Sequence, residues 1–310
     1  MVGEDIQAYK VIEKGDFAYN PARINVGSIA KYEGNGKCMI SSLYVCFNTI
    51  DRIDRDWFMH LLKTPKMNFY YNLNGEGGVR VYLFYPNFAR IRSSYPSLAE
   101  QKKIAEMLSL IDERIATQSK IIEEQETLLK SLADKLFLQN NHSCLLSELV
   151  NIVKGKQINA DTLSETGDYY VMNGGITPSG YYSEYNVPAG SISISEGGNS
   201  CGYVQFNEKP FWSGGHCYSL QCRTNLVDYK YIYYYLKTKE ADVMALRIGS
   251  GLPNIQKKDI EKFTISYPSL QLQKQFVKAL DALSGKINTE KNLLEKYCRQ
   301  KSYLLSQMFI

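Results

Sequence analysis

The chain has 310 residues, of which 44% are hydrophobic and 22% are charged, so it is not a disordered chain and can fill about two domains. Its 36 Lys and Arg against 32 Asp and Glu give a net charge of +4, which is too small to identify a nucleic-acid-binding protein and too small to exclude one. No apolar run approaches the roughly 18 residues of a membrane span, and the N-terminus has neither a basic start nor an apolar stretch. We therefore expect a cytoplasmic protein without a membrane association.

Cysteine spacing gives no support for a metal site. The seven cysteines are an odd number without a CxxC pair, and the group of Cys201, His216, Cys217 and Cys222 lacks the spacing of zinc ligands. Reduced core thiols and no bound metal are the expectation. The 24 tyrosines suit either a core or a planar recognition surface.

The first 94 residues predict a small α/β domain. Tyr19–Lys31 is a polar glycine-containing loop, Ser41–Phe47 is strand-like, and Ile53–Thr64 reads as a short helix. A glycine turn over 75–77 and a short segment then lead toward a long helix.

A helix with a narrow apolar stripe is predicted over 95–140. Apolar and amide residues recur in alternating steps of four and three, the spacing of a coiled-coil seam. Pro96 suits the first turn of such a helix. The apolar seam positions are Ile104, Leu108, Ile111, Ile115, Ile122, Leu129 and Leu132.

The segment over 141–266 predicts a second α/β domain of the same kind. Strand-like runs cover Ser191–Ser195 and Cys217–Cys222, and a short helix over Val227–Thr238 ends in Lys-Thr, like the one in the first domain. A glycine turn over 249–251 precedes the approach to the second long helix.

The second long helix, over 267–310, repeats the first. Tyr267-Pro268-Ser269-Leu270 copies Tyr95-Pro96-Ser97-Leu98 at an offset of 172 residues, and 95–137 align with 267–309 without a gap. Its apolar seam positions are Phe276, Leu280, Leu283, Ile287, Leu294 and Leu304.

The two long helices suit each other as partners. Residues 95–140 carry a net charge of −2 and residues 267–310 a net charge of +4. We expect an antiparallel coiled coil whose polar seam residues, Gln118, Gln125, Glu290 and Lys301, fix the register. Separate packing of each helix on its own domain is the alternative.

No catalytic constellation is found in the sequence. It contains three histidines and neither a GxSxG elbow, a phosphate-binding GxxxxGK[ST] loop nor a dinucleotide fingerprint. Asn20-Pro21-Ala22-Arg23 is only half of an amino-methyltransferase signature. His216 and Cys217 are adjacent in a predicted strand, where neighbouring side chains point to opposite faces, so they do not form a nucleophile pair. We expect no enzyme activity and no cofactor.

Three polar glycine loops, 19–31, 197–203 and 247–258, are candidates for DNA contact. Lys and Arg hold phosphates, while Arg, Asn, Gln and Ser also read base edges. Solvated turns without a ligand are the alternative. The candidate residues are Arg23, Asn25, Lys31, Asn199, Ser200, Tyr203, Arg247, Ser250, Asn254, Gln256, Lys257 and Lys258.

The twofold arrangement of domain and long helix resembles the specificity subunits of type I restriction-modification systems over essentially the whole chain. The helix starts Tyr95-Pro-Ser-Leu-Ala-Glu-Gln-Lys-Lys-Ile and Tyr267-Pro-Ser-Leu-Gln-Leu-Gln-Lys-Gln-Phe are similar to that family's Pro-x-Leu-x-Glu-Gln-x-x-Ile pattern. In the second copy Leu272 replaces the usual Glu. Gly249-Ser-Gly-Leu-Pro-Asn-Ile is similar to the family's approach to the helix.

The resemblance implies a non-catalytic subunit that recognises a two-part site on double-stranded DNA. It implies target-recognition domains over 1–94 and 141–266, a spacer helix over 95–140 and a C-terminal helix over 267–310. It also implies two DNA adenine methyltransferase subunits and an ATP-dependent restriction subunit as partners, which would hold the cofactors.

The first domain departs from this pattern because it is 32 residues shorter than the second (126 − 94). It has no counterpart of the stretch from Leu146 to Gly175, whose apolar residues predict strand and core in the second domain. We therefore expect an N-terminally incomplete first domain and self-association or completion by another chain. The alternatives are a degenerate subunit that acts as a coiled-coil scaffold or toxin-neutralising partner without full DNA readout, and a specificity module of a fused restriction enzyme.

Overall fold

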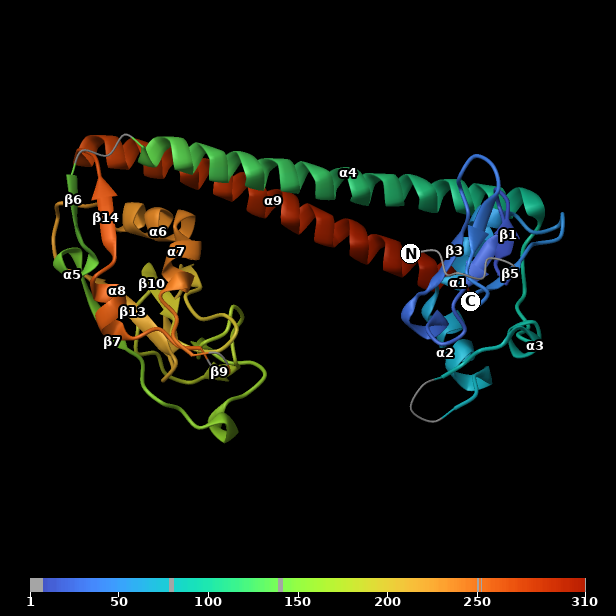
Figure 1. The fold of residues 1–310 in the computed structure, drawn as a ribbon, viewed down its shortest axis with the longest axis horizontal. Coiled ribbons are helices and arrows are strands. Elements are labelled where there is room, and N and C mark those ends of the chain that lie inside the picture. Colours follow the sequence, from blue (N-terminus) through green and yellow to red (C-terminus); the bar gives the residue numbers. More distant parts are fainter. Residues whose placement is uncertain (1–7, 78–80, 139–141, 250, 252, 310) are drawn as a thin grey trace. The chain divides into compact units, whose positions relative to one another are not determined.

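The computed structural model describes the chain except residues 1–7, 78–80, 139–141, 250, 252 and 310. Two compact units are present, a first unit of residues 1–121 with 290–310 and a second unit of residues 122–289. Two long helices, α4 (Leu98–Phe137) and α9 (Leu270–Met308), contribute one segment to each unit (Figure 1). Each unit therefore has its own pair of helix segments.

The first unit combines small antiparallel sheets with short helices. The strands form a three-stranded sheet in the order β3-β2-β5 and a separate β1-β4 pair. The elements are β1 (Lys10–Ile12), β2 (Phe17–Tyr19), a 3-10 turn η1 (Ile24–Val26), β3 (Ile29–Lys31), β4 (Cys38–Ile40), β5 (Val45–Phe47), α1 (Arg55–Leu62), α2 (Pro65–Asn74) and α3 (Tyr85–Phe88). The core combines aliphatic residues with aromatic pairs: Phe17 stacks on Phe47 at 5.2 Å, and Trp57 packs on Phe309 at 5.6 Å.

The single strand predicted over Ser41–Phe47 is wrong. Only β5 lies within it, because Ser41 accepts hydrogen bonds from the N–H of Tyr44 through its carbonyl and from that of Leu43 through its hydroxyl. These local bonds form a turn in competition with a strand ladder. The short helix is present as α1 and begins after Asp54, whose carboxylate accepts from the N–H groups of Asp56 and Trp57.

The second unit has a larger set of sheets. Strands in the order β11-β10-β13-β7 form an antiparallel sheet, β12-β8-β9 form a mixed sheet, and β14 pairs with β6. The strands are β6 (His142–Leu145), β7 (Val150–Lys154), β8 (Tyr169–Met172), β9 (Tyr181–Tyr182), β10 (Ser191–Ser195), β11 (Val204–Asn207), β12 (Phe211–Ser213), β13 (Cys217–Cys222) and β14 (Thr264–Tyr267). The helices are α5 (Leu146–Leu149), η2 (Ala160–Thr162), α6 (Tyr229–Thr238), α7 (Glu240–Ala245) and α8 (Lys257–Glu261).

The opening stretch of the second domain supplies strand and core, as its apolar residues predict. Leu146, Leu149, Val150 and Ile152 are at most 3% exposed, and β7 pairs with β13. The same core receives α4 and α9, because Phe137 packs edge-on against Tyr231 at 5.3 Å and Phe276 and Leu280 are buried in it.

The two long helices are antiparallel in the first unit. Gln118 Nε2 donates to Glu290 Oε2 at 2.6 Å, Arg114 Nε donates to the Tyr297 hydroxyl at 3.0 Å, and Lys301 pairs with Asp112. In these three pairs the residue number on α4 decreases as the number on α9 increases, which is the order of antiparallel helices. In both units the apolar seam residues are buried or half-buried. The α/β class with two long antiparallel helices is confirmed.

Both long helices begin later than predicted. The prediction that Pro96 lies in the first turn is wrong, because Ser97 caps the helix and Pro96 precedes it. The Ser97 hydroxyl donates to the carboxylate of Glu100 at 2.6 Å, and the Ser97 N–H donates to the same oxygen at 3.0 Å. These hydrogen bonds hold the pKa of the Glu100 carboxyl below its usual range. Pro268 likewise precedes α9, between Tyr267 at the end of β14 and Leu270.

A buried glutamine at each helix start fastens the helix to its domain in the same way. In the first unit Gln101 Oε1 accepts from the N–H of Asp54 at 2.8 Å, and Nε2 donates to the carbonyls of Arg52 at 3.1 Å and Pro96 at 2.9 Å. Gln101 is 0% exposed. The aligned Gln273 in the second unit repeats this set of bonds, so the repeat extends to a hydrogen-bonded joint that serves structure.

Candidate nucleic-acid interface

Two of the three predicted loops lie together in the second unit. The 197–203 loop follows β10, and the 247–258 loop follows α7, although its last two residues, Lys257 and Lys258, begin α8. The Gly198 N–H donates to the Pro253 carbonyl at 3.0 Å, and Gly197 forms an antiparallel bridge with Asn254. The structure therefore gathers the candidate side chains of both loops at the end of β10.

Most candidate side chains of these loops are at the surface. Asn199, Arg247, Asn254, Gln256, Lys257 and Lys258 are exposed. Ser200 and Tyr203 are half-buried, and Lys237 Nζ lies 4.0 Å from the centre of the Tyr203 ring. Ser250 lies outside the described residues. The exposed amide and cationic groups have the chemistry to reach phosphates and base edges.

A buried carboxylate supports the two loops. Glu196 follows β10 and is 6% exposed, and its Oε1 accepts from Nζ of Lys154 at 2.7 Å and from the hydroxyl of Tyr218 at 2.9 Å. Its carbonyl accepts from the Ile255 N–H at 2.8 Å, which attaches the 247–258 loop to β10. Burial, together with the bond to Glu196, raises the pKa of Tyr218, so its phenol remains a donor.

Three polar side chains at this end were missed by sequence reasoning. Lys154 ends β7, Asn173 follows β8 and His216 precedes β13, so they are far apart along the chain. The His216 N–H donates to Asn173 Oδ1 at 3.1 Å, and the side chains of Lys154 and His216 are 55% and 63% exposed. Glycine pairs at 174–175 and 214–215 were the available signal, because they mark turns beside these residues.

The third loop lies in the first unit, where its candidates are Arg23, Asn25 and Lys31. Arg23 is exposed, and the Asn25 amide donates to Asn72 Oδ1 at 3.1 Å. Lys31 is 10% exposed at its side chain and pairs with the carboxylates of Glu33, at 2.7 Å, and Asp56. The two carboxylates neutralise the charge of the Lys31 ammonium group.

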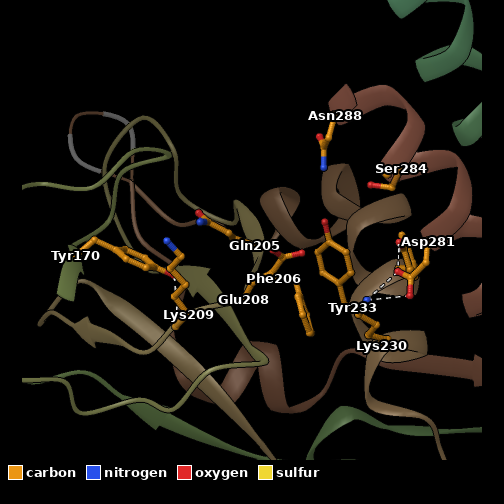
Figure 2. A pocket seen from close by; sticks show the side chains of 12 residues that line it. Tyr170, Gln205, Phe206, Glu208, Lys209, Lys230, Tyr233, Asp281, Ser284 and Asn288 are labelled. Atoms are coloured by element: carbon orange, nitrogen blue, oxygen red, sulfur yellow. Dashed lines mark hydrogen bonds and ion pairs between the residues drawn. The ribbon is translucent and has the colours of Figure 1, made fainter. Parts of the chain in front are cut away.

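An open pocket of about 550 Å³ lies between β11 and α9 in the second unit (Figure 2). Aromatic rings and polar groups line it: Tyr170, Gln205, Phe206, Glu208, Lys209, Lys230, Tyr233, Tyr234, Asp281, Ser284, Gly285 and Asn288. Lys230 Nζ contacts both Asp281 oxygens, at 2.8 and 2.9 Å, and the Tyr234 hydroxyl donates to Asp281 at 2.6 Å. These bonds occupy the Asp281 carboxylate, which makes it a joint between α6 and α9 and a poor general base.

Over the described part of the chain, no group of three or more His, Cys, Asp or Glu could hold a metal ion, and no helix could span a membrane. All seven cysteines are free. The prediction that the cysteines are core thiols is wrong for three of them. Cys38 and Cys222 are exposed on strands, and Cys298 is exposed on α9. Cys217 is buried, and burial raises the pKa of its thiol to about 11.

Comparison with known proteins agrees with this architecture. The family model described as the type I restriction modification DNA specificity domain matches residues 142–296. This match covers half of the chain, and the chain therefore belongs to the type I restriction-modification specificity family.

Two relatives bear the name of a type I specificity subunit. The one from Mycoplasma pneumoniae is 33% identical over 152 residues, which are 48% of this chain and 40% of the relative. The one from Mycoplasma genitalium is 28% identical over 195 residues, which are 58% of this chain and 49% of the relative. The matches thus span less than half the length of these relatives.

The fold is also similar to that of a solved structure. The crystal structure of the type I restriction-modification S subunit from M. genitalium superposes with a TM-score of 0.73 at 21% identity, covering 96% of this chain and 83% of that one. At this identity the likeness establishes the fold.

Proposed function

We propose that the chain is the DNA sequence-specificity subunit of a type I restriction-modification complex, without catalytic activity of its own. It recognises a two-part site on double-stranded DNA in the cytoplasm and positions two adenine methyltransferase subunits and an ATP-dependent restriction subunit there. The proposal divides the chain into target-recognition domains over 1–94 and 141–266, joined to the helices over 95–140 and 267–310.

One observation carries this proposal: the joined loops of the second unit. Exposed Arg247, Asn254, Gln256 and Lys258 lie on a backbone that is held by the buried Glu196. Side chains on a fixed backbone lose less freedom on binding, which favours sequence discrimination over loose phosphate contact. The hydrogen bonds of Gln101 and Gln273 attach each domain to the start of its long helix at a defined position.

The test is coexpression with type I adenine methyltransferase subunits in a methylation-deficient host, followed by mapping of methylated adenines. We expect one two-part sequence to be modified. Alanine at Arg247, Gln256 and Lys258 together should weaken binding and alter that sequence, because a base-reading residue is worth about 1–3 kcal/mol and each lost phosphate contact lowers the salt slope by about one.

The matched control replaces Lys239, Lys274 and Gln275, which are exposed elsewhere in the second unit and carry the same charge and amide content. Equal effects of the two triple variants on the methylated sequence and on DNA affinity would contradict the assignment of this face.

A second candidate is a degenerate subunit that serves as a scaffold without full readout. The first unit favours it, because Lys31 is neutralised and the Asn25 amide is engaged. Methylation directed by a one-part sequence would support this candidate, and self-association would be measured in the same preparation by light scattering.

A further inference from the structure

His216 lies at the surface, in the turn that precedes β13. Its side chain is 63% exposed, whereas the neighbouring Cys217 is 2% exposed in the core. A histidine at such a position presents a ring that can donate or accept hydrogen bonds. Core packing therefore does not account for it.

The ring of His216 lies near a carboxylate oxygen of Glu196 that has no hydrogen-bond partner among the described residues. Glu196 Oε1 has Lys154 and Tyr218 as donors, but Oε2 is buried and has no hydrogen-bond partner among the residues described. Nδ1 of His216 lies 3.9 Å from this oxygen. Because a buried acceptor without a partner is unfavourable, a movement of the ring by about 1 Å toward Oε2 would form a favourable hydrogen bond.

Two glycines from other turns lie beside His216, and the one at 174 leaves space next to its Cβ. A Cβ added to Gly174 would lie 3.1 Å from the Cβ of His216, and one added to Gly197 would lie 3.9 Å from its Nδ1. Gly174 has a φ of +87°, which a residue with a side chain rarely adopts. The His216 N–H donates to Asn173 Oδ1, so the backbone that carries the ring is held in place.

We propose that His216 is a DNA-contacting residue of the second domain and that Glu196 is its positioning residue. In the doubly protonated ring both nitrogens are donors: Nδ1 donates to Glu196 Oε2, and Nε2 donates to an acceptor on DNA. That acceptor is a phosphate oxygen or the edge of a purine, whose N7 accepts in the major groove. This inference rests on the proposed function and adds a contact from outside the two predicted loops.

The experiment measures binding of a cognate duplex by the complex of the full chain with its methyltransferase subunits. We expect His216→Ala to weaken binding about ten-fold and His216→Gln, whose amide N–H can donate to the same DNA acceptor, to stay within about three-fold of the unaltered chain. His142→Ala is the control, since His142 is exposed in the same unit. Fluorescence of the chain without its partners, in a Trp57→Phe background that leaves Trp212, checks that each variant is folded.

Two further arms define the roles. A phosphate contact lowers affinity for all sequences and reduces the salt slope by about one, whereas a base contact relaxes preference at one position. If Glu196 acts through the ring, the effect of Glu196→Gln on affinity should shrink at least three-fold in the His216→Ala background, with Glu208→Gln as the exposed control.

If both folded His216 variants match His142→Ala in affinity, salt slope and methylated sequence, the inference is wrong while the proposed function stands. If the unaltered complex neither binds nor methylates a specific sequence, both are overturned. An equal effect of Glu196→Gln with and without His216 removes the positioning role.

Discussion

Replacing Gln273 by alanine should detach α9 from the domain it supports in the second unit. Gln273 is 0% exposed and makes three hydrogen bonds. Oε1 accepts from the Asp228 N–H at 2.8 Å, and Nε2 donates to the carbonyls of Pro268 at 2.8 Å and Leu226 at 3.4 Å. The substitution thus removes a link between the start of α9 and the cap of α6.

The expected loss of unfolding free energy is about 3 kcal/mol. One N–H and two carbonyls lose their partner, and a net hydrogen bond contributes about 1 kcal/mol, with more lost where the remaining group is left buried and unpaired. Gln275→Ala is the control, because Gln275 is exposed two residues further along α9 and its loss should cost within about 0.5 kcal/mol.

Urea unfolding followed by tryptophan fluorescence measures this loss for each unit separately. The chain has two tryptophans, Trp57 in the first unit and Trp212 in the second. In a Trp57→Phe background, Gln273→Ala should lower the midpoint of the Trp212 transition. Equal midpoints for Gln273→Ala and Gln275→Ala would refute the reasoning that the buried amide fastens the helix.

Three other outcomes are expected. Inserting four residues after Gln125 shifts the seam by half a heptad, so the methylated site should change its spacer or be lost; an unchanged spacer counts against a ruler role. Burial lowers the pKa of His60 below 6.5, against the opposing effect of Asp112, so the unfolded chain binds the proton more readily than the folded one. The urea midpoint of the Trp57 transition should therefore fall as the pH drops below 6.5, and it should fall less in His60→Gln. Cys217, buried with a pKa of about 11, should resist a thiol reagent that labels Cys298 within the same time in native protein, and equal labelling rates would contradict its burial.

Helix periodicity and the repeat were readable from the sequence because they depend on local spacing. The seam from Ile104 to Leu132 and its copy in α9 follow a strict heptad, and the helix partner buries that stripe. The strands over Ser191–Ser195 and Cys217–Cys222 match β10 and β13 in their bounds, since each is a β-prone run between turns. The family also followed from the sequence, because its motif recurs at both helix starts.

Side-chain partners far apart in sequence were decided by the tertiary structure. Lys31, which the sequence predicts as a phosphate contact, pairs with Asp56 of α1 in the folded unit. Gln101 and Gln273 looked like ordinary helix residues, yet each satisfies backbone groups more than forty residues away.

The candidate interface also has some features that the sequence indicated and others that only the tertiary structure decided. Glycine and polar composition indicated the 197–203 and 247–258 loops from the sequence. Folding brought the two loops together and placed His216 Nδ1 3.9 Å from Glu196 Oε2. Local preference sets a helix, a strand or a turn, because its hydrogen bonds join residues close in sequence. Which charge is neutralised and which polar group is left at a surface depends on the neighbours that the completed core supplies.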